Sequence, residues 1–305
     1  MLEKNKKIFV DAHFHYSQCN KSKIPPENWK GCSCALDENE FELQQNKQNI
    51  FTSFGIHPFD CIEIEKNKSL FERKISFLQN KLTENKIHAI GEIGFDFFTD
   101  EYKKFSKLQE EMFLQQIELA QIYKMPIVIH ARKSDEKLFE FSNRLKKIPA
   151  VLFHSFMGTS NKAQSLIGRG INAYFSFGKQ IMNNNKKTID CVKNLPIQNL
   201  LLETDAPYQK LKNQAETFPS EIIDVYKAAF SLRFNFSKRS AACSHEIFCV
   251  LILTSFAMIF SILFCIFLLL FSVLSSASVR PCSFSTSLNM RRLRKMRACR
   301  RAEAL

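Results

Sequence analysis

Short apolar runs alternate with longer amphipathic stretches along residues 1–233 of the chain. This alternation is typical of repeated strand–helix units. We predict eight strands, at residues 7–13, 31–36, 50–57, 87–93, 126–130, 149–154, 171–177 and 199–204. We predict helices between several of them, at residues 67–83, 101–124, 134–147, 160–169, 184–193 and 219–232.

Eight strands that alternate with helices indicate the α/β class and a (β/α)8 TIM barrel of about 230 residues. A doubly wound open sheet would alternate in the same way, but it normally carries a glycine-rich turn after its first strand. Residues 11–20, DAHFHYSQCN, contain no glycine. Polar residues also recur at the end of strand after strand, which favours the barrel. The interval between the first and third strands is short and is broken by Pro25 and Pro26, so we expect an abbreviated first strand–helix unit.

Charge divides the chain into two parts. Residues 1–233 carry 28 Lys and 5 Arg against 28 acidic residues, a net charge of +5. Residues 234–305 carry 2 Lys and 8 Arg but only two acidic residues, a net charge of +8. We therefore predict a globular barrel over 1–233 and a separate tail, rich in Phe, Ser and Arg, over 234–305. The positive charge of the barrel mildly favours a polyanionic partner.

The tail contains a 28-residue segment without any charge, residues 247–274. This length exceeds the roughly 20 apolar residues that a transmembrane helix needs, so we predict a membrane-spanning helix. The alternative is a read-through in another reading frame, which would equally explain the loss of acids. No secretory segment precedes the first strand, and the cysteines show no disulfide spacing. We therefore expect a cytoplasmic catalytic domain with reduced thiols, associated with a membrane through the tail.

Histidines and acids lie at the ends of the predicted strands. His13 and His15 end the first strand, and alternate residues of a strand point to the same side. Other strands end at His57, Glu92, His130, His154 and Asp205. Active sites of (β/α)8 enzymes gather at this face. Four imidazoles and two carboxylates are too many for one tetrahedral zinc ion, but they suit two divalent metal ions that share a carboxylate. Glu92 is the natural bridge.

Six motifs stand in a fixed order along the chain. They are DxHxH at 11–15, GxHP at 55–58, GEIGxD at 91–96, PxxxHxR at 126–132, HxFxG at 154–158 and ETDxP at 203–207. In order and spacing these motifs resemble the TatD family of metal-dependent deoxyribonucleases, which belongs to the amidohydrolase-like barrel superfamily. The resemblance covers roughly residues 7–232.

The resemblance implies a role for each matching residue. The two divalent metal ions (Zn, Mg or Mn) would be held by His13, His15, Glu92, His130, His154 and Asp205. In this assignment Glu92 bridges the two ions, and Asp205 is the general base for the attacking water.

Three further residues are implied around the ligands. His57 would orient or protonate the scissile phosphate. Arg132 would pair with a phosphate, unless it forms a salt bridge to Asp135 or Glu136. Glu203 would orient a metal ligand or cap its loop.

The chain departs from the family pattern in two places. The family often has a second histidine after Pro58, where this chain has Phe59. The family also follows its last strand with helices that finish the barrel, whereas here only Ser220–Leu232 resembles that region. We therefore expect a barrel without its closing C-terminal helix, which leaves one barrel strand uncovered.

The function predicted from the sequence is that of a divalent-metal-dependent hydrolase that cleaves phosphodiester bonds. A deoxyribonuclease or exonuclease acting on single-stranded DNA or duplex ends is the favoured form. One alternative is a hydrolase of another ester or amide, such as an aminoacyl-tRNA ester, because the same site chemistry serves both. The other alternative is a degenerate, non-enzymatic protein tethered to a membrane.

Residues 247–274 are expected to partition into membrane when the full chain is expressed. A charge-free apolar segment of this length favours hydrocarbon over water. Alkaline carbonate extraction of the expressing cells measures this: the chain should stay in the membrane pellet, and its release into the supernatant would exclude an anchor. Resequencing around codon 233 separates a genuine tail from a frame error.

Overall fold

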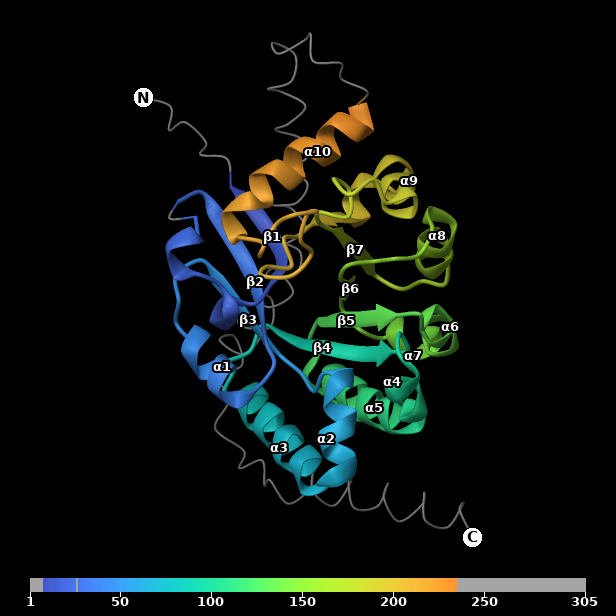
Figure 1. Ribbon diagram of the computed structural model, residues 1–305. Coiled ribbons are helices and arrows are strands. Elements are labelled where there is room, and N and C mark those ends of the chain that lie inside the picture. Colours follow the sequence, from blue (N-terminus) through green and yellow to red (C-terminus); the bar gives the residue numbers. More distant parts are fainter. Residues whose placement is uncertain (1–7, 26, 235–305) are drawn as a thin grey trace, which may run out of the picture. The chain divides into compact units, whose positions relative to one another are not determined.

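The computed structural model describes residues 8–25 and 27–234, which contain eight parallel strands paired in chain order (Figure 1). The strands are β1 (Phe9–Phe14), β2 (Trp29–Ala35), β3 (Ile50–Phe54), β4 (Ala89–Asp96), β5 (Ile127–Arg132), β6 (Val151–Phe153), β7 (Ala173–Phe177) and β8 (Leu200–Leu202). Each neighbouring pair from β1–β2 to β7–β8 is parallel. The α/β class and the eight predicted strands are confirmed.

Helices follow most of the strands and surround the sheet (Figure 1). They are α1 (Glu38–Gln44), α2 (Cys61–Lys66), α3 (Ser69–Thr83), α4 (Asp100–Lys104), α5 (Ser106–Tyr123), α6 (Asp135–Glu140), α7 (Ser142–Leu145), α8 (Ser160–Gly168), α9 (Lys186–Asn194) and α10 (Ile222–Phe234). Two predicted helices are each divided, at Phe105 and at Phe141. The described residues between β1 and β2 form only two short 3-10 turns, which confirms the abbreviated first unit.

Helix α1 was not predicted, although its first turn carries a recognisable capping pattern. The Asp37 carboxylate accepts a hydrogen bond from the Glu40 amide at 2.8 Å. The Glu40 carboxylate in turn accepts from the Leu36 amide at 2.8 Å. Such reciprocal bonds satisfy amide groups that a helix start leaves unpaired. The D-x-x-E spacing therefore explains why a helix as short as seven residues forms here.

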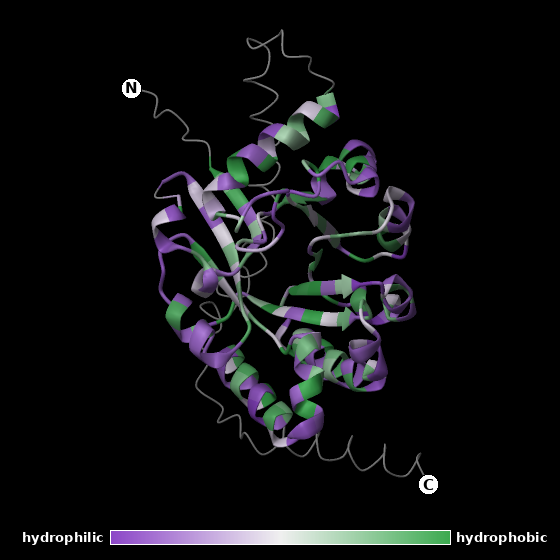
Figure 2. Ribbon diagram, in the orientation of Figure 1, coloured by the Kyte–Doolittle hydropathy of each residue, from purple (hydrophilic) through white to green (hydrophobic). Residues whose placement is uncertain are grey.

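Alternation along the strands separates two apolar layers. One layer contains strand residues together with helix residues, such as Ile127 with Ile117. The other contains no helix residue among the described part of the chain and fills the barrel interior: Ala12, Cys34, Ala89, Val128, Ala150, Leu152, Tyr174 and Leu201. The strands are accordingly more hydrophobic than the outer faces of the helices (Figure 2). In β5 the residue two positions after the interior Val128 is His130, and after β6 the residue two positions beyond Leu152 is His154, so both face the carboxyl end of the barrel.

Hydrogen bonds close the seam between β8 and β1 just beyond the strand ends. The Asp205 amide donates to the His13 carbonyl at 2.9 Å, and the His15 amide donates to the Ala206 carbonyl at 2.8 Å. The buried Asp11 carboxylate accepts from both the amide and the hydroxyl of Thr204, at 2.9 and 2.6 Å. These bonds fix the loop after β8 against the end of β1.

Helix α10 covers this seam, so the expectation of a barrel strand left uncovered after β8 is wrong for the described residues. The helix contacts both β1 and β8. Its Tyr226 hydroxyl donates to the Val10 carbonyl at 3.2 Å, and Val225, Tyr226 and Phe230 are buried. A helix over 219–232 was predicted from the sequence, close to the observed Ile222–Phe234, and only its covering position against β1 and β8 was missed.

The predicted membrane segment, residues 247–274, lies outside the described residues and stays a prediction. Across residues 8–25 and 27–234, no helix combines the length and the apolar character that crossing a membrane requires.

Tyr226 provides a test of the seam. Replacing Tyr226 by Ala should lower the free energy of unfolding by about 3–5 kcal/mol, because a buried aromatic ring leaves a cavity. Replacing it by Phe should cost only about 1 kcal/mol, because the ring stays and one hydrogen bond is lost. Urea unfolding of a chain that ends at residue 234 measures both. Equal stability of all three chains would contradict the role assigned to α10.

Candidate metal centre

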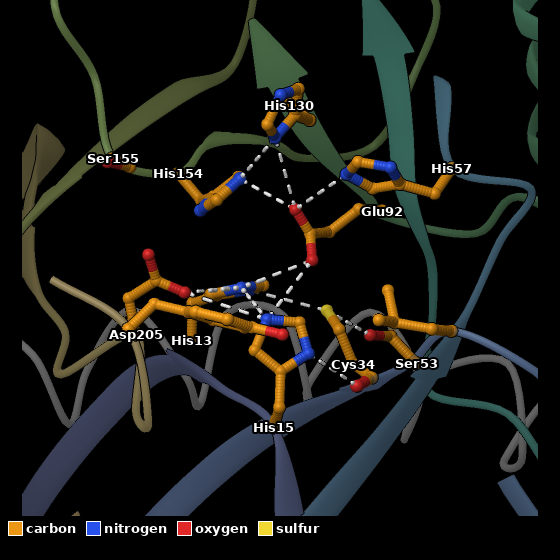
Figure 3. A network of polar contacts seen from close by, with 12 residues as sticks. His13, His15, Cys34, Ser53, His57, Glu92, His130, His154, Ser155 and Asp205 are labelled. Atoms are coloured by element: carbon orange, nitrogen blue, oxygen red, sulfur yellow. Dashed lines mark hydrogen bonds and ion pairs between the residues drawn. The ribbon is translucent and has the colours of Figure 1, made fainter. Parts of the chain in front are cut away.

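The carboxylate of Glu92 lies at the centre of a buried cluster of histidines (Figure 3). Glu92 belongs to β4 and is 3% exposed. Its Oε1 atom lies 3.4 Å from Nε2 of His13 and 3.4 Å from Nε2 of His15. Its Oε2 atom lies 2.7 Å from Nε2 of His154 and 3.4 Å from Nδ1 of His130. The cluster therefore has two halves that share one carboxylate, and its members come from the ends of different strands.

The first half consists of His13, His15, Asp205 and Oε1 of Glu92. The two Nε2 atoms of the histidines lie 3.3 Å apart. Asp205 Oδ1 lies 3.5 Å from Nε2 of His13 and 3.6 Å from Nε2 of His15. Donor atoms bound at about 2.0–2.2 Å to a tetrahedral ion lie about 3.3–3.6 Å from one another. The distances between these donor atoms therefore fit a divalent metal ion.

The second half consists of His130, His154 and Oε2 of Glu92. His130 Nδ1 and His154 Nε2 lie 3.3 Å apart, and both face the carboxylate. The other ring nitrogen of His154, Nδ1, is buried and has no hydrogen-bond partner among the described residues. Because Nε2 is the nitrogen that faces Glu92, Nδ1 would stay without a partner in the described part of the chain when a metal ion binds in this half. The donor set of this half, two imidazoles and a carboxylate, also suits a divalent metal ion.

In His15 and His130, one ring nitrogen faces away from Glu92 and forms a hydrogen bond. That hydrogen bond decides whether the other ring nitrogen, which faces Glu92, can bind a metal ion. His15 Nδ1 lies 3.1 Å from the Cys34 carbonyl oxygen, which can only accept, so Nδ1 donates and in the neutral ring Nε2 carries the lone pair. His130 Nε2 lies 2.9 Å from Asp96 Oδ2, so it donates and Nδ1 keeps its lone pair. Both lone pairs face Glu92. The hydrogen bonds behind these two rings therefore orient each of them so that it could serve as a metal ligand.

His57 shows the opposite arrangement. Its Nδ1 accepts a hydrogen bond from the Phe59 amide at 3.1 Å, so in the neutral ring the proton sits on Nε2. That Nε2 lies 3.7 Å from Glu92 Oε2. Burial lowers the pKa of His57, which keeps the ring neutral. His57 therefore faces the cluster with a donor, as suits contact with a substrate oxygen, and not with the lone pair that a metal ligand needs.

The electrostatics of the cluster favour ionised carboxylates. Burial alone would raise the pKa of Glu92, but the charges of His154 and His13 hold it well below its usual value. Burial opposes ionisation of Asp205 too, and hydrogen bonds from His13 and His15 lower its pKa overall. Burial lowers the pKa of His15, but the hydrogen bond to Asp205 and the negative charges of Glu92 and Asp205 together raise it overall. Protons on His13 and His15, whose pKa values are raised, thus supply positive charge that a metal ion would replace on binding.

Three residues that support the site were not singled out from the sequence. Asp96 orients His130, and its place four residues after Glu92 in the same strand was the available sign. Cys34 contacts His13 Nδ1 through Sγ at 3.3 Å. Gln209 donates from Nε2 to Asp205 Oδ2 at 3.2 Å. Cys34 and Gln209 carry no motif, so only the fold brings them to the site.

The two remaining predicted residues lie beside the cluster. Glu203 accepts hydrogen bonds from the Ser176 hydroxyl and from Gln209 Nε2, and it adjoins Asp205. Arg132 lies at the rim, where its guanidinium is 3.6 Å from Asp96 Oδ2 and its side chain is 42% exposed. The acid it approaches is therefore Asp96, whereas Asp135 pairs with Lys162.

Comparison with known proteins identifies the family to which this chain belongs. The family model described as TatD related DNase matches residues 10–244, which is more than half of the chain. The chain belongs to the TatD-related DNase family. The TatD-type relatives include the uncharacterized metal-dependent hydrolase YabD of Bacillus subtilis, 31% identical over 170 residues. That match covers 55% of this chain and 62% of YabD, so the chain spans less than two thirds of that relative's length.

Two further likenesses cover more of the TatD fold. The uncharacterized metal-dependent hydrolase BU355 of Buchnera aphidicola is 32% identical over 226 residues, which is 66% of this chain and 81% of that protein. The crystal structure of YjjV, a TatD homologue from Escherichia coli K12, is 25% identical with a TM-score of 0.67. It covers 82% of this chain and 97% of YjjV. The chain thus belongs to the TatD family, and its buried His, Glu and Asp groups could hold a metal ion.

Replacing Glu92 by Gln should remove most of the bound metal, because a neutral amide is a poor ligand for cations in either half. Metal content after dialysis against zinc, measured by mass spectrometry, should fall sharply, and the rise in melting temperature on adding zinc should shrink. Glu110→Gln is the matched control, since Glu110 pairs with Lys137 outside the cluster. Unchanged metal content in the Glu92 variant would exclude Glu92 as a ligand.

Proposed function

We propose that the chain is a two-metal hydrolase of phosphodiester bonds that acts on DNA. One observation carries this proposal: the two carboxylate oxygens of Glu92 face two separate groups of donor atoms. Two divalent ions that share such a carboxylate supply Lewis-acid stabilisation of the negative charge that develops on phosphoryl oxygens. The remaining steps belong to the protein's own side chains.

Asp205 is the proposed general base. Its Oδ1 faces His13 and His15, and its Oδ2 accepts a hydrogen bond from Gln209, so both oxygens are held in position. Burial raises the pKa of Asp205, but the hydrogen bonds from His13 and His15, together with nearby positive charge, lower it overall, so the carboxylate is ionised at neutral pH. The ionised form can accept the proton of the attacking water as its oxygen bonds to phosphorus.

His57 is proposed to hydrogen-bond the scissile phosphate. Its neutral ring carries a proton on Nε2, which points into the cluster from the side of His130 (Figure 3). A neutral donor there can stabilise a phosphoryl oxygen, or give its proton to the departing oxygen, without competing for a metal ion. This role requires the hydrogen bond that the backbone amide of Phe59 donates to His57 Nδ1. The side chain of Phe59 takes no part in that hydrogen bond.

A polyanion is supported as substrate by cations at the rim of the site. Arg132 follows the ligand His130 by two residues, and Lys133 is next to it. Both lie over the ring of Phe98, at 4.1 and 4.6 Å from its centroid. Cations held near the reacting phosphate can pair with the neighbouring phosphates of a nucleic acid strand. A small neutral ester would not use them.

Replacing Asp205 by Asn should lower DNA hydrolysis by about 10²–10⁴-fold, because the amide cannot accept the proton of the water. Metal ions in the His130 and His154 half should remain bound. The measurement is nucleotide release from single-stranded DNA beside metal content, with Asp224→Asn on α10 as the control. Substantial activity at full metal occupancy would move the base elsewhere, with His57 as the first candidate.

A further inference from the structure

Exposed apolar side chains gather on the loops at the carboxyl ends of the strands. Two of the large apolar side chains that stand out as exposed among the described residues, Leu43 and Ile122, lie on outer helices. The others follow strands β3, β4, β6 and β8: Phe59, Phe98, Met157 and Tyr208. Single exposed apolar residues are common on any surface. Their concentration around one catalytic face indicates a binding surface instead.

Phe59 lies against one side of the cluster. Its ring centroid is 4.5 Å from that of His57 and 5.8 Å from that of His130. The ring also stacks on Tyr102 at 4.5 Å with an interplanar angle of 11°. Phe59 is nevertheless 40% exposed. A fixed aromatic ring with accessible area therefore adjoins the half of the site that contains His130.

Tyr208 lies against the other side. Its ring centroid is 5.2 Å from that of His15, and its hydroxyl donates to Gln18 Oε1 at 2.5 Å, which holds the ring in place. Tyr208 is 46% exposed. His15 and His57 lie on opposite sides of the Glu92 carboxylate (Figure 3). The two rings consequently flank the position where a scissile phosphate would meet both halves.

We infer that Phe59 and Tyr208 form two stacking platforms for the nucleobases on either side of the scissile phosphate. The inference rests on the proposed function, since it assigns subsites for the DNA strand that this site would cleave. A phosphodiester joins two nucleosides, so a phosphate centred over Glu92 carries one base toward each half. Bases stack on aromatic rings without regard to sequence. Both rings are held by neighbours before a strand binds, so little conformational entropy is lost.

Phe98 has a different role in this arrangement. Arg132 and Lys133 already lie over its ring, at 4.1 and 4.6 Å from the centroid. The ring of Phe98 is therefore already in contact with cations. These cations could pair with a phosphate farther along the DNA strand. Met157 has no aromatic face. Phe59 and Tyr208 are thus the rings left to receive bases.

The test compares two strands of equal length and charge, an oligodeoxythymidylate and an abasic oligonucleotide, with the full chain and divalent metal. Phe59→Leu keeps the backbone amide that bonds His57 but removes the aromatic ring. It should lower kcat/KM for the thymidylate strand about 5- to 100-fold, mainly through KM, and change abasic cleavage much less. Tyr208→Leu should have the same effect on kcat/KM as Phe59→Leu. Phe59→Trp and Tyr208→Phe keep an aromatic ring and should retain the preference for the thymidylate strand over the abasic strand. Ile122→Ala, an exposed apolar residue on an outer helix, is the control.

The outcomes separate the two proposals. An equal loss on both strands would mean that Phe59 only supports His57, and it would overturn the stacking platforms. Unchanged kinetics on both strands would overturn them as well. Failure of the unaltered chain to cleave either strand, while it still binds metal, would instead overturn the proposed function on which the platforms rest.

Discussion

A carboxylate buried among histidines, Glu92, is the constraint on which the rest of this structure depends. A buried carboxylate is unfavourable by itself. Several imidazoles packed 2.7–3.4 Å from it and from one another are unfavourable too, unless positive charge is shared among these groups. Protons supply that charge in part, and bound divalent ions would supply it more completely. The hydrogen bonds behind the rings of His15 and His130 then fix which nitrogen faces inward.

The barrel provides this arrangement through strand alternation and a closed seam. Interior residues such as Val128 and Leu152 fill the barrel, and the residues two positions later bring His130 and His154 to its carboxyl end. The bonds between the β1 end and the loop after β8 bring Asp205 beside His13. Helix α10 supports that seam from outside through Tyr226. The same loops carry Phe59 and Tyr208, so the surface for a substrate and the site share one scaffold.

The fold and the ligand set could be read from local sequence because strand periodicity and strand-end polar residues are local properties. Hydrophobic runs located all eight strands, and six motifs pointed to the residues that surround Glu92. What could not be predicted depends on packing between distant segments. Cys34 and Gln209 reach the site only through the barrel, and the covering role of α10 follows from its contact with β1, far away in the chain. The tautomer of His57 likewise depends on a turn that no periodicity reveals.

The most direct test of the account is anomalous X-ray scattering from crystals grown with zinc, recorded on both sides of the zinc absorption edge. The account predicts two anomalous peaks, one beside each oxygen of Glu92. One peak should lie among His13, His15 and Asp205, and the other beside His130 and His154, with none bound to His57. A single peak that Glu92 does not contact, or a peak bound to His57 Nε2, would contradict the shared carboxylate and the tautomer assignment.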